Sequence, residues 1–208
     1  MNLTLFHSPG TRSIRVRWLL EELNLPYELK SIVYDGAYFA SDEYRQINPM
    51  GKVPALYDGD TLLVESIAIM EYLIHRYGSG SMGVASDHSE YAEYLQWLHM
   101  PESGMANYIA VSFGNSFNRD PYRVSKEYDA YCRFQITKAL DMLENQLQDR
   151  EYILKSGFSA ADISLGYTLF FAKTCTGTQF TDVVKEYYGR LMARPAAQKA
   201  LSDLKSQN

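Results

Sequence analysis

The sequence has few cysteines, no long apolar run and no excess of basic residues, and each absence excludes a class of protein. Its two cysteines, Cys132 and Cys175, form no CxxC or Cys/His metal spacing, so we expect buried thiols and no metal site. No run of 18 apolar residues occurs, so we expect no membrane partner. The formal net charge of −5, without a basic tract, argues against nucleic acid as a partner.

The beginning of the chain, MNLTLFHSPG, lacks the charged segment and the apolar run of a signal peptide, so we expect a cytoplasmic protein. The composition is otherwise that of a globular protein, with 46% hydrophobic and 22% charged residues. A chain of 208 residues can bury a hydrophobic core without disulfides or metal ions.

Strand and helix patterns alternate in the first part of the chain. Period-two alternation and an Asp-Gly turn predict strands at residues 2–7, 27–33, 53–57 and 61–64. Helical periodicity predicts helices at residues 13–24, near 41–47 and from Ser66 onward. The first of these helices has Arg15, Arg17 and Glu21 on its polar face. Residues 34–51 are otherwise irregular, and the predicted order is β-α-β-α-β-β-α.

The second part of the chain has almost no strand pattern. Residues 78–83 (GSGSMG) have the composition of a flexible connection, so we assign residues 1–77 to a first domain and 78–89 to a linker. Residues 90–208 form an all-α domain, with helices predicted at 90–117, 123–148, 160–173, 181–193 and 196–204. The segment Asn118–Pro121 separates the first two of them. Ser159 and Asp162 form a capping box, which predicts a structural role for Asp162.

This arrangement resembles the cytosolic glutathione transferase family over essentially the whole chain. Three groups of residues carry the resemblance: residues 8–13 (SPGTRS), residues 48–56 (NPMGKVPAL), and Glu65 with Ser66. The resemblance implies an α/β thioredoxin-like domain that holds glutathione, followed by an all-α helical domain that contributes the hydrophobic-substrate site. It also implies glutathione as co-substrate, no metal, and a homodimer.

The resemblance further implies which residues bind glutathione. Val53, before a cis Pro54, would pair with the cysteinyl backbone of glutathione. Ser66, at a helix N-terminus, would bind the γ-glutamyl carboxylate, and Glu65 would meet the ammonium group. Further candidates are Lys52, Arg45 and Arg12. A cap for Ser66, a solvated surface position for Arg45 and an ion pair for Arg12 are the alternatives.

The reaction depends on the glutathione thiol, which at a pKa near 8.5 is only about 3% thiolate at pH 7. Lowering that pKa by about two units takes roughly 2.7 kcal/mol, which a hydroxyl donor and a helix N-terminus can supply. Phe6 stands where tyrosine-type transferases keep a tyrosine, and residues 8–13 contain no cysteine. Ser8 falls where serine-type transferases keep their catalytic serine, so the resemblance implies Ser8 as the donor. Thr11 and Ser13 are the competitors, followed by a mechanism that uses only the backbone. For all three hydroxyls the alternative is turn formation or capping of the first helix.

The sequence thus predicts a glutathione transferase that activates the thiol for attack on a small hydrophobic electrophile. The alternatives are a non-catalytic glutathione-binding or regulatory protein of the same fold, and a glutathione-dependent isomerase or peroxidase. Met105 and Tyr108 are candidates for the second-substrate pocket, although such a stripe is more often core. Glu102 is a candidate to approach the glutathione of the partner subunit, with a solvated glutamate as the alternative.

Overall fold

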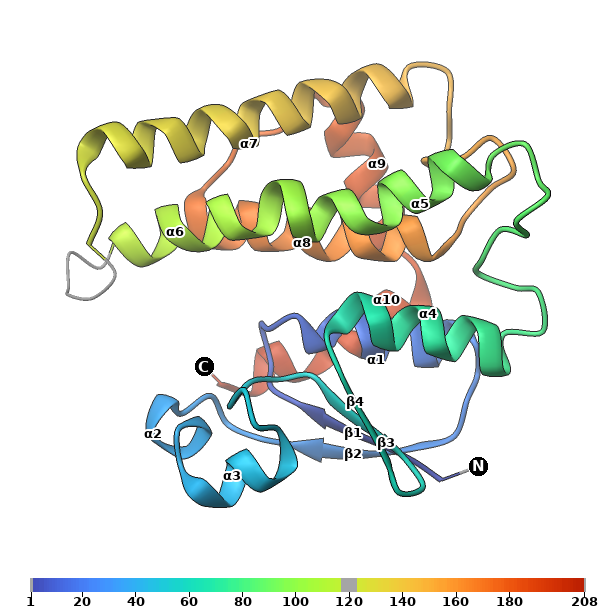
Figure 1. Ribbon diagram of the computed structural model, residues 1–208. Helices are drawn as coiled ribbons and strands as arrows, with labels where there is room; N and C mark the ends of the chain where they lie inside the picture. Colours follow the sequence, from blue (N-terminus) through green and yellow to red (C-terminus); the bar gives the residue numbers. More distant parts are fainter. Residues whose placement is uncertain (1, 117–122, 208) are drawn as a thin grey trace. The chain divides into compact units, whose positions relative to one another are not determined.

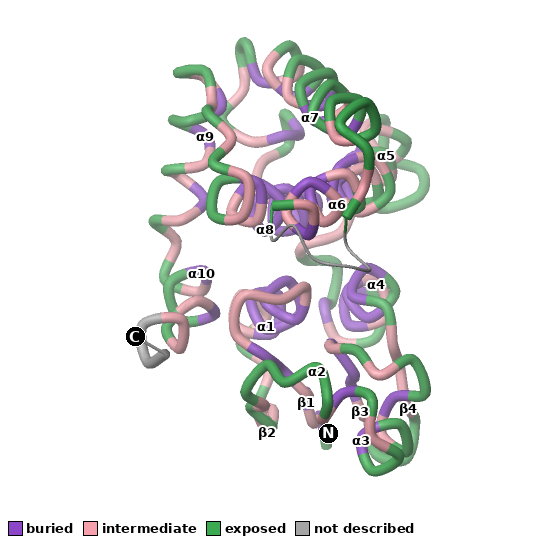
Figure 2. Tube along the Cα trace, turned by 90° about the vertical axis from the view of Figure 1, so that its left-hand side faces the viewer, coloured by how far each residue is buried: buried purple, intermediate pink, exposed green. Residues whose placement is uncertain are grey.

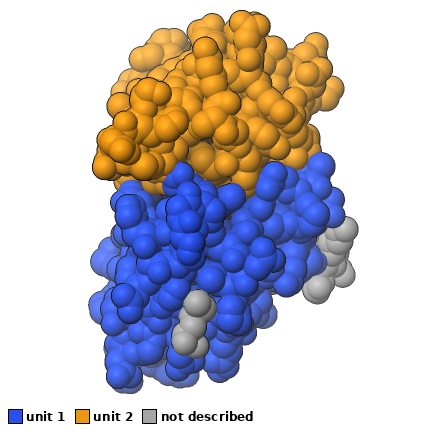
Figure 3. All heavy atoms as spheres, turned by 90° about the vertical axis from the view of Figure 1, so that its right-hand side faces the viewer, with its two compact units in different colours: residues 1–83, 193–208 blue, residues 84–192 orange. Residues whose placement is uncertain are grey.

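The computed structural model describes residues 2–116 and 123–207, and the side chains of residues 2–116 and 123–204. The chain divides into two compact units, one of residues 1–83 with 193–208 and one of residues 84–192 (Figure 3). This division differs from the predicted one, which assigned the whole chain after residue 89 to the helical domain. Helix α10 (Pro195–Ala200) packs against α1 (Ser13–Glu22), and this contact joins the end of the chain to the first unit.

The first unit is built on a four-stranded sheet with the order β2-β1-β3-β4 (Figure 1). Strand β1 (Leu3–His7) runs parallel to β2 (Tyr27–Ser31) and antiparallel to β3 (Ala55–Asp58). Strand β4 (Thr61–Val64) continues from β3 as a hairpin. The predicted strands are confirmed, and the mixed sheet is that of a thioredoxin-like domain.

Helix α1 is buried over nearly its whole length. It packs against β1 of the sheet, and against α4 (Ser66–Tyr77) and α10. These two helices lie on the same side of the sheet as α1 (Figure 1). All eight residues from Ser13 to Leu20 are buried (Figure 2). Arg15 and Arg17, on the polar face of the predicted helix, are therefore buried as well, because α4 and α10 flank the helix.

The segment predicted to be irregular contains two short helices, α2 (Gly36–Phe39) and α3 (Asp42–Ile47). Each begins at a side-chain cap: Asp35 accepts a hydrogen bond from the N–H of Ala37, and Ser41 accepts one from the N–H of Tyr44. The rings of Phe39 and Tyr44 pack edge to face, with centroids 4.8 Å apart. The helix predicted near residues 41–47 is confirmed, whereas α2 was not predicted.

The second unit is helical in the part that the structure describes. Its helices are α5 (Tyr91–Met100), α6 (Asn107–Ser116), α7 (Lys126–Leu147), α8 (Ala160–Thr176) and α9 (Asp182–Met192). A π-helical segment, Pro101–Ala106, joins α5 to α6. Pro101 has no N–H for an ordinary helical hydrogen bond, which explains why the pattern changes there. The break predicted at residues 118–121 lies outside the described residues.

The N-terminus of α8 is held by Asp162, which is completely buried. Its carboxylate accepts hydrogen bonds from the N–H of Ser159 (2.8 Å), the N–H of Ile153 (2.9 Å) and the hydroxyl of Tyr187 (2.8 Å). The predicted capping box between Ser159 and Asp162 is present. Asp162 thus ties three segments of the second unit together, in agreement with its predicted structural role.

The two cysteines are unpaired, Cys132 buried and Cys175 half-buried. Within the described ranges 2–116 and 123–207, no helix has the length and apolar character needed to span a membrane. The same ranges contain no cluster of three His, Cys, Asp or Glu side chains placed to hold a metal ion.

Candidate active site

The loop between β1 and α1, residues 8–12, brings the hydroxyls of Thr11 and Ser13 into one hydrogen-bond network with the backbone of Ser8. The backbone N–H of Ser8 donates to Ser13 Oγ (3.2 Å), and the Ser8 carbonyl accepts from Thr11 Oγ1 (2.7 Å). The hydroxyls of Thr11 and Ser13 also contact each other at 2.7 Å. Ser8 is fully buried, and its own Oγ has no hydrogen-bond partner among the described residues.

This network continues into the interior of the first unit through His7, the last residue of β1. Ser13 Oγ lies 2.8 Å from His7 Nδ1, and His7 Nε2 lies 3.0 Å from Asp203 Oδ2. Arg17 Nη1 donates to the same Asp203 oxygen at 2.7 Å. Both His7 and Ser13 are fully buried. A residue of the C-terminal segment is thereby connected to the loop that carries Ser8.

The charge state of His7 decides the direction of these hydrogen bonds. Burial is the largest influence on the pKa of His7 and lowers it. Arg17 lowers it further, Asp203 raises it, and the net pKa is below the usual value of 6.5, so the ring is neutral at pH 7. The carboxylate of Asp203 can only accept, so Nε2 carries the proton and Nδ1 is an acceptor. Ser13 therefore donates its hydroxyl hydrogen to His7 and accepts the N–H of Ser8.

The turn before β3 is organised by Asn48, which is buried. Asn48 Oδ1 accepts from the N–H of Met50 (2.9 Å), and Asn48 Nδ2 donates to the carbonyl of Lys52 (2.6 Å). Tyr44 also donates to that carbonyl at 3.0 Å, and burial raises its pKa, so the hydroxyl keeps its proton. Gly51 has φ +60°, and a Cβ there would collide with the carbonyl oxygen of Phe39.

The peptide bond between Val53 and Pro54 is cis, as the resemblance implied. Pro54 is buried, Val53 is half-buried and the side chain of Lys52 is exposed. Among the described residues, the backbone N–H and C=O of Val53 form no hydrogen bond with the protein. The polar edge of this turn is therefore open to an extended, peptide-like ligand.

Glu65 and Ser66 form the start of α4. Glu65 is exposed and adopts φ 72°, a backbone conformation that is uncommon for any residue other than glycine. Ser66 is 4% exposed, and its Oγ accepts a hydrogen bond from Arg15 Nη1 at 3.1 Å. This contact orients the Ser66 hydroxyl, whose hydrogen stays available for an acceptor at the N-terminus of a helix of 12 residues.

The remaining candidates differ in their surroundings. Arg12 is half-buried at the start of α1, and Arg45 is exposed on α3. Met105 is fully buried in a cluster with residues of α6, α7 and α8, which is the core position given as the alternative to a pocket role. Tyr108 is half-buried, packs against the same cluster and meets the ring of Tyr131 at 6.0 Å. Glu102 is half-buried in the π-helical segment.

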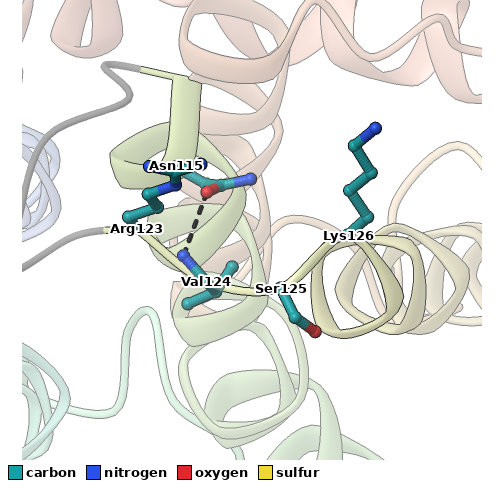
Figure 4. A pocket seen from close by; sticks show the side chains of 5 residues that line it. All are labelled: Asn115, Arg123, Val124, Ser125 and Lys126. Atoms are coloured by element: carbon teal, nitrogen blue, oxygen red, sulfur yellow. Dashed lines mark hydrogen bonds between the residues drawn. The ribbon is translucent and has the colours of Figure 1, made fainter.

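Two of the surface cavities in the described part of the second unit are lined by residues outside the β1–α1 loop. The larger, about 590 Å³, is lined by Asn115, Arg123, Val124, Ser125 and Lys126 (Figure 4). The N–H of Val124 donates to Asn115 Oδ1 across it, at 3.1 Å. The smaller, about 240 Å³, includes Arg150 and Arg190 in its lining. None of the predicted glutathione-binding residues lines either cavity.

Three residues of this network were not singled out from the sequence: His7, Arg15 and Asp203. His7 follows Leu3 and Leu5 at the period-two spacing of the inward face of β1, so its burial had a signal in the sequence. A polar side chain at such a position needs hydrogen-bond partners. The contact between His7 and Asp203 joins residues 196 positions apart, and no local pattern indicates it.

Comparison with known proteins agrees with this geometry. Residues 5–81 match the family model for the glutathione S-transferase N-terminal domain, and residues 133–194 match the model for the C-terminal domain. Glutathione S-transferase 3 of Schizosaccharomyces pombe is 32% identical over 182 residues, which cover 82% of this chain and 74% of that protein. Glutathione S-transferase GstA of Escherichia coli O157:H7 is 28% identical, covering 96% of this chain and 98% of that protein.

Among solved structures, the glutathione transferase URE2P6 of Phanerochaete chrysosporium, in complex with oxidized glutathione, is similar to this chain. It superposes with a TM-score of 0.83 and 29% identity, covering 98% of this chain and 96% of that one. Both halves of the chain match the same family, and the fold and the relatives agree. The chain therefore belongs to the glutathione S-transferase family and is a glutathione transferase.

Proposed function

We propose that this transferase activates glutathione through the hydroxyl of Ser8, which donates a hydrogen bond to the thiolate. The thiolate then attacks the electrophilic carbon of a small hydrophobic substrate. The observation that carries the proposal is the state of Ser8 Oγ, which is buried and has no hydrogen-bond partner among the described residues. An unsatisfied buried hydroxyl costs about 1–3 kcal/mol, and a bound thiolate would remove that cost.

Counting hydroxyl hydrogens separates Ser8 from its two competitors. Ser13 has a single hydroxyl hydrogen, and a neutral His7 with its proton on Nε2 requires that hydrogen at Nδ1. Thr11 also has one, and both of its close acceptors, the Ser8 carbonyl and Ser13 Oγ, belong to the network. Of these three residues, only Ser8 has a hydroxyl hydrogen that the network does not use.

The glutathione backbone fits the groups at the β3 turn and at α4. The unpaired N–H and C=O of Val53, beside cis Pro54, would pair with the cysteinyl residue. Ser66 would donate to the γ-glutamyl carboxylate at the positive end of α4, and the exposed Glu65 would bind the ammonium group. Lys52, Arg45 and Arg12 are the cations proposed for the glutathione carboxylates. The crystal structure of the similar protein URE2P6 in complex with oxidized glutathione supports glutathione as the ligand.

Retention on immobilised glutathione and the ultraviolet absorbance of bound thiolate test the proposal. We expect the protein to be retained, and to lower the thiol pKa from about 8.5 to about 6.5. Conjugation of a small aromatic electrophile should follow the same pH profile. Retention without thiolate would favour a non-catalytic glutathione-binding protein, and a protein that is not retained would contradict the glutathione site.

Replacement of Ser66 tests the binding part separately. We expect Ser66→Ala to raise the KM for glutathione about tenfold, the equivalent of one charge-assisted hydrogen bond, and to leave kcat nearly unchanged. Ser125→Ala is a matched control, because Ser125 also stands at a helix start and accepts from the N–H of Tyr128. This control should lower stability by about 1 kcal/mol without changing KM. An unchanged KM in Ser66→Ala would limit the role of Ser66 to its contact with Arg15, because the N-cap position of α4 is Glu65 and no side chain caps the helix.

From the family resemblance we also propose that the protein is a homodimer and is cytoplasmic. We further propose that Glu102 approaches the partner subunit's glutathione and that Tyr108 contributes to the second-substrate site. Sedimentation equilibrium of the purified chain measures the oligomeric state directly. A monomer at micromolar concentration would contradict the homodimer.

A further inference from the structure

The chain of contacts behind Ser8 ends at a residue of the C-terminal segment. We propose that His7, with its ring proton fixed by Asp203, is a positioning residue for thiol activation, because it anchors Ser13 Oγ and thereby the backbone of Ser8. The inference rests on the proposed role of Ser8. His7 is not itself assigned a contact with the thiol, because both of its ring nitrogens are occupied, Nδ1 by Ser13 Oγ and Nε2 by Asp203 Oδ2.

The contacts form a continuous path. Asp203 Oδ2 accepts from His7 Nε2 (3.0 Å), His7 Nδ1 accepts from Ser13 Oγ (2.8 Å), and Ser13 Oγ accepts the N–H of Ser8 (3.2 Å). His7 and Ser13 each donate in one direction and accept in the other, while Asp203 only accepts and the N–H of Ser8 only donates, so the hydrogen bonds are mutually consistent. The path therefore holds the backbone N–H of Ser8 and does not use the Ser8 hydroxyl hydrogen that the thiolate would receive.

Asp203 matters because it selects the tautomer. A neutral imidazole exists in two forms, and only the form with the proton on Nε2 offers Nδ1 as an acceptor to Ser13. Asp203 and Arg17 are the charged groups that act on the His7 ring, and Arg17 holds the carboxylate in place through a 2.7 Å contact. Without Asp203 the proton can move to Nδ1. Ser13 would then direct its hydroxyl hydrogen into the loop, toward the Ser8 carbonyl at 3.2 Å.

Two isosteres of histidine separate positioning from packing. Asparagine places an oxygen near the position of Nδ1, so His7→Asn keeps an acceptor for Ser13 and loses the contact with Asp203. Glutamine reaches toward the position of Nε2, so His7→Gln keeps the contact with Asp203 and loses the acceptor. Both replace a buried aromatic ring by an amide, so a residue that only fills space should respond similarly to either.

We expect His7→Gln to raise the pKa of the glutathione thiol by about one unit, which lowers kcat/KM about tenfold below that pKa, while the KM for glutathione changes little. His7→Asn should stay within about threefold of the wild type, or about 0.6 kcal/mol at 25 °C. Asp203→Ala should resemble His7→Gln. In the His7→Asn background, Asp203→Ala should add nothing to the thiol pKa, because the amide oxygen accepts without help from Asp203.

Two measurements without glutathione make the inference independent of the proposed function. Nitrogen NMR of the imidazole should find His7 protonated at Nε2 and not at Nδ1, and hydrogen exchange at the N–H of Ser8 should be about tenfold faster in His7→Gln than in His7→Asn. Three results would overturn the inference. They are protonation of His7 at Nδ1, equal exchange at Ser8 in His7→Gln and His7→Asn, and an equal effect of Asp203→Ala in the wild type and in His7→Asn. A wild type that binds glutathione without lowering its thiol pKa would instead overturn the role of Ser8.

Discussion

Ser8→Ala should lower kcat/KM at pH 6.5 by about 50-fold, the largest effect on activity that we expect from a single substitution. The estimate follows from the thiol pKa: if it returns from about 6.5 to about 8.5, the thiolate fraction at pH 6.5 falls from about one half to about 1%. The KM for glutathione should change little, because the groups that bind its carboxylates are elsewhere. Initial rates of conjugation over a range of pH measure both quantities.

The pH dependence of this effect has a definite sign. A hydrogen bond to the thiolate stabilises the charged form and lowers the pKa, so removing it raises the pKa. The variant should therefore be much slower than the wild type at low pH and approach it above pH 9, where the thiol ionises unaided. A thiolate of higher pKa is also the stronger nucleophile, which favours this convergence. A deficit that stays constant with pH would speak against thiol activation by Ser8.

Thr11→Val provides the comparison with the competing hydroxyl. Its hydroxyl hydrogen lies within the network and the side-chain shape is preserved, so we expect a loss of less than about fivefold. A loss in Thr11→Val that exceeds the one in Ser8→Ala would move the assignment to Thr11. Both variants should still be retained on immobilised glutathione, which shows that the fold and the binding site persist.

Asp162→Ala should lower the free energy of unfolding by about 4 kcal/mol, the largest effect on stability that we expect. The carboxylate accepts from the N–H groups of Ser159 and Ile153 and from the hydroxyl of Tyr187, all in a completely buried environment. Truncation leaves these three donors without a partner, and each unsatisfied buried group costs about 1–3 kcal/mol. Urea unfolding followed by circular dichroism measures the loss.

Asp162→Asn and Tyr187→Phe make this prediction specific. Asparagine keeps one acceptor oxygen but turns an NH₂ group toward the remaining donors, so we expect about half of the loss seen in alanine. Tyr187→Phe removes one donor and leaves the two backbone contacts, so it should cost only about 1 kcal/mol. If Asp162→Ala and Tyr187→Phe lower the free energy of unfolding equally, the backbone contacts of Asp162 contribute nothing, and the capping explanation fails.

Most of the fold followed from local patterns in the sequence. The Asp-Gly turn predicted the hairpin of β3 and β4, and the capping box predicted the start of α8, because both depend on neighbours along the chain. Helix α2 was not predicted, because a single helical turn has no periodicity to detect. The cap at Asp35 was the available signal in the sequence. The burial of Arg15 and Arg17 was not predicted either, because their partners are distant in the sequence: Ser66 for Arg15, and Ala200 and Asp203 for Arg17.

The candidate site divides in the same way. Ser8, cis Pro54 and Ser66 were found because the family resemblance attaches them to short motifs. His7 and Asp203 belong to no motif, and their contact arises only when the C-terminal segment packs against α1. The buried polar position of His7 on β1 was readable, but the identity of its partner was not.

The packing of α10 against α1 has a consequence for the order in which the protein matures. A ribosome releases the N-terminal residues first, and domains generally fold in that order during synthesis. Here the sheet and the Ser8 loop are made early, whereas Asp203 follows His7 by 196 positions. The nascent chain can form its strands, but the hydrogen-bond path to Ser8 closes only after the segment that carries Asp203 has been made.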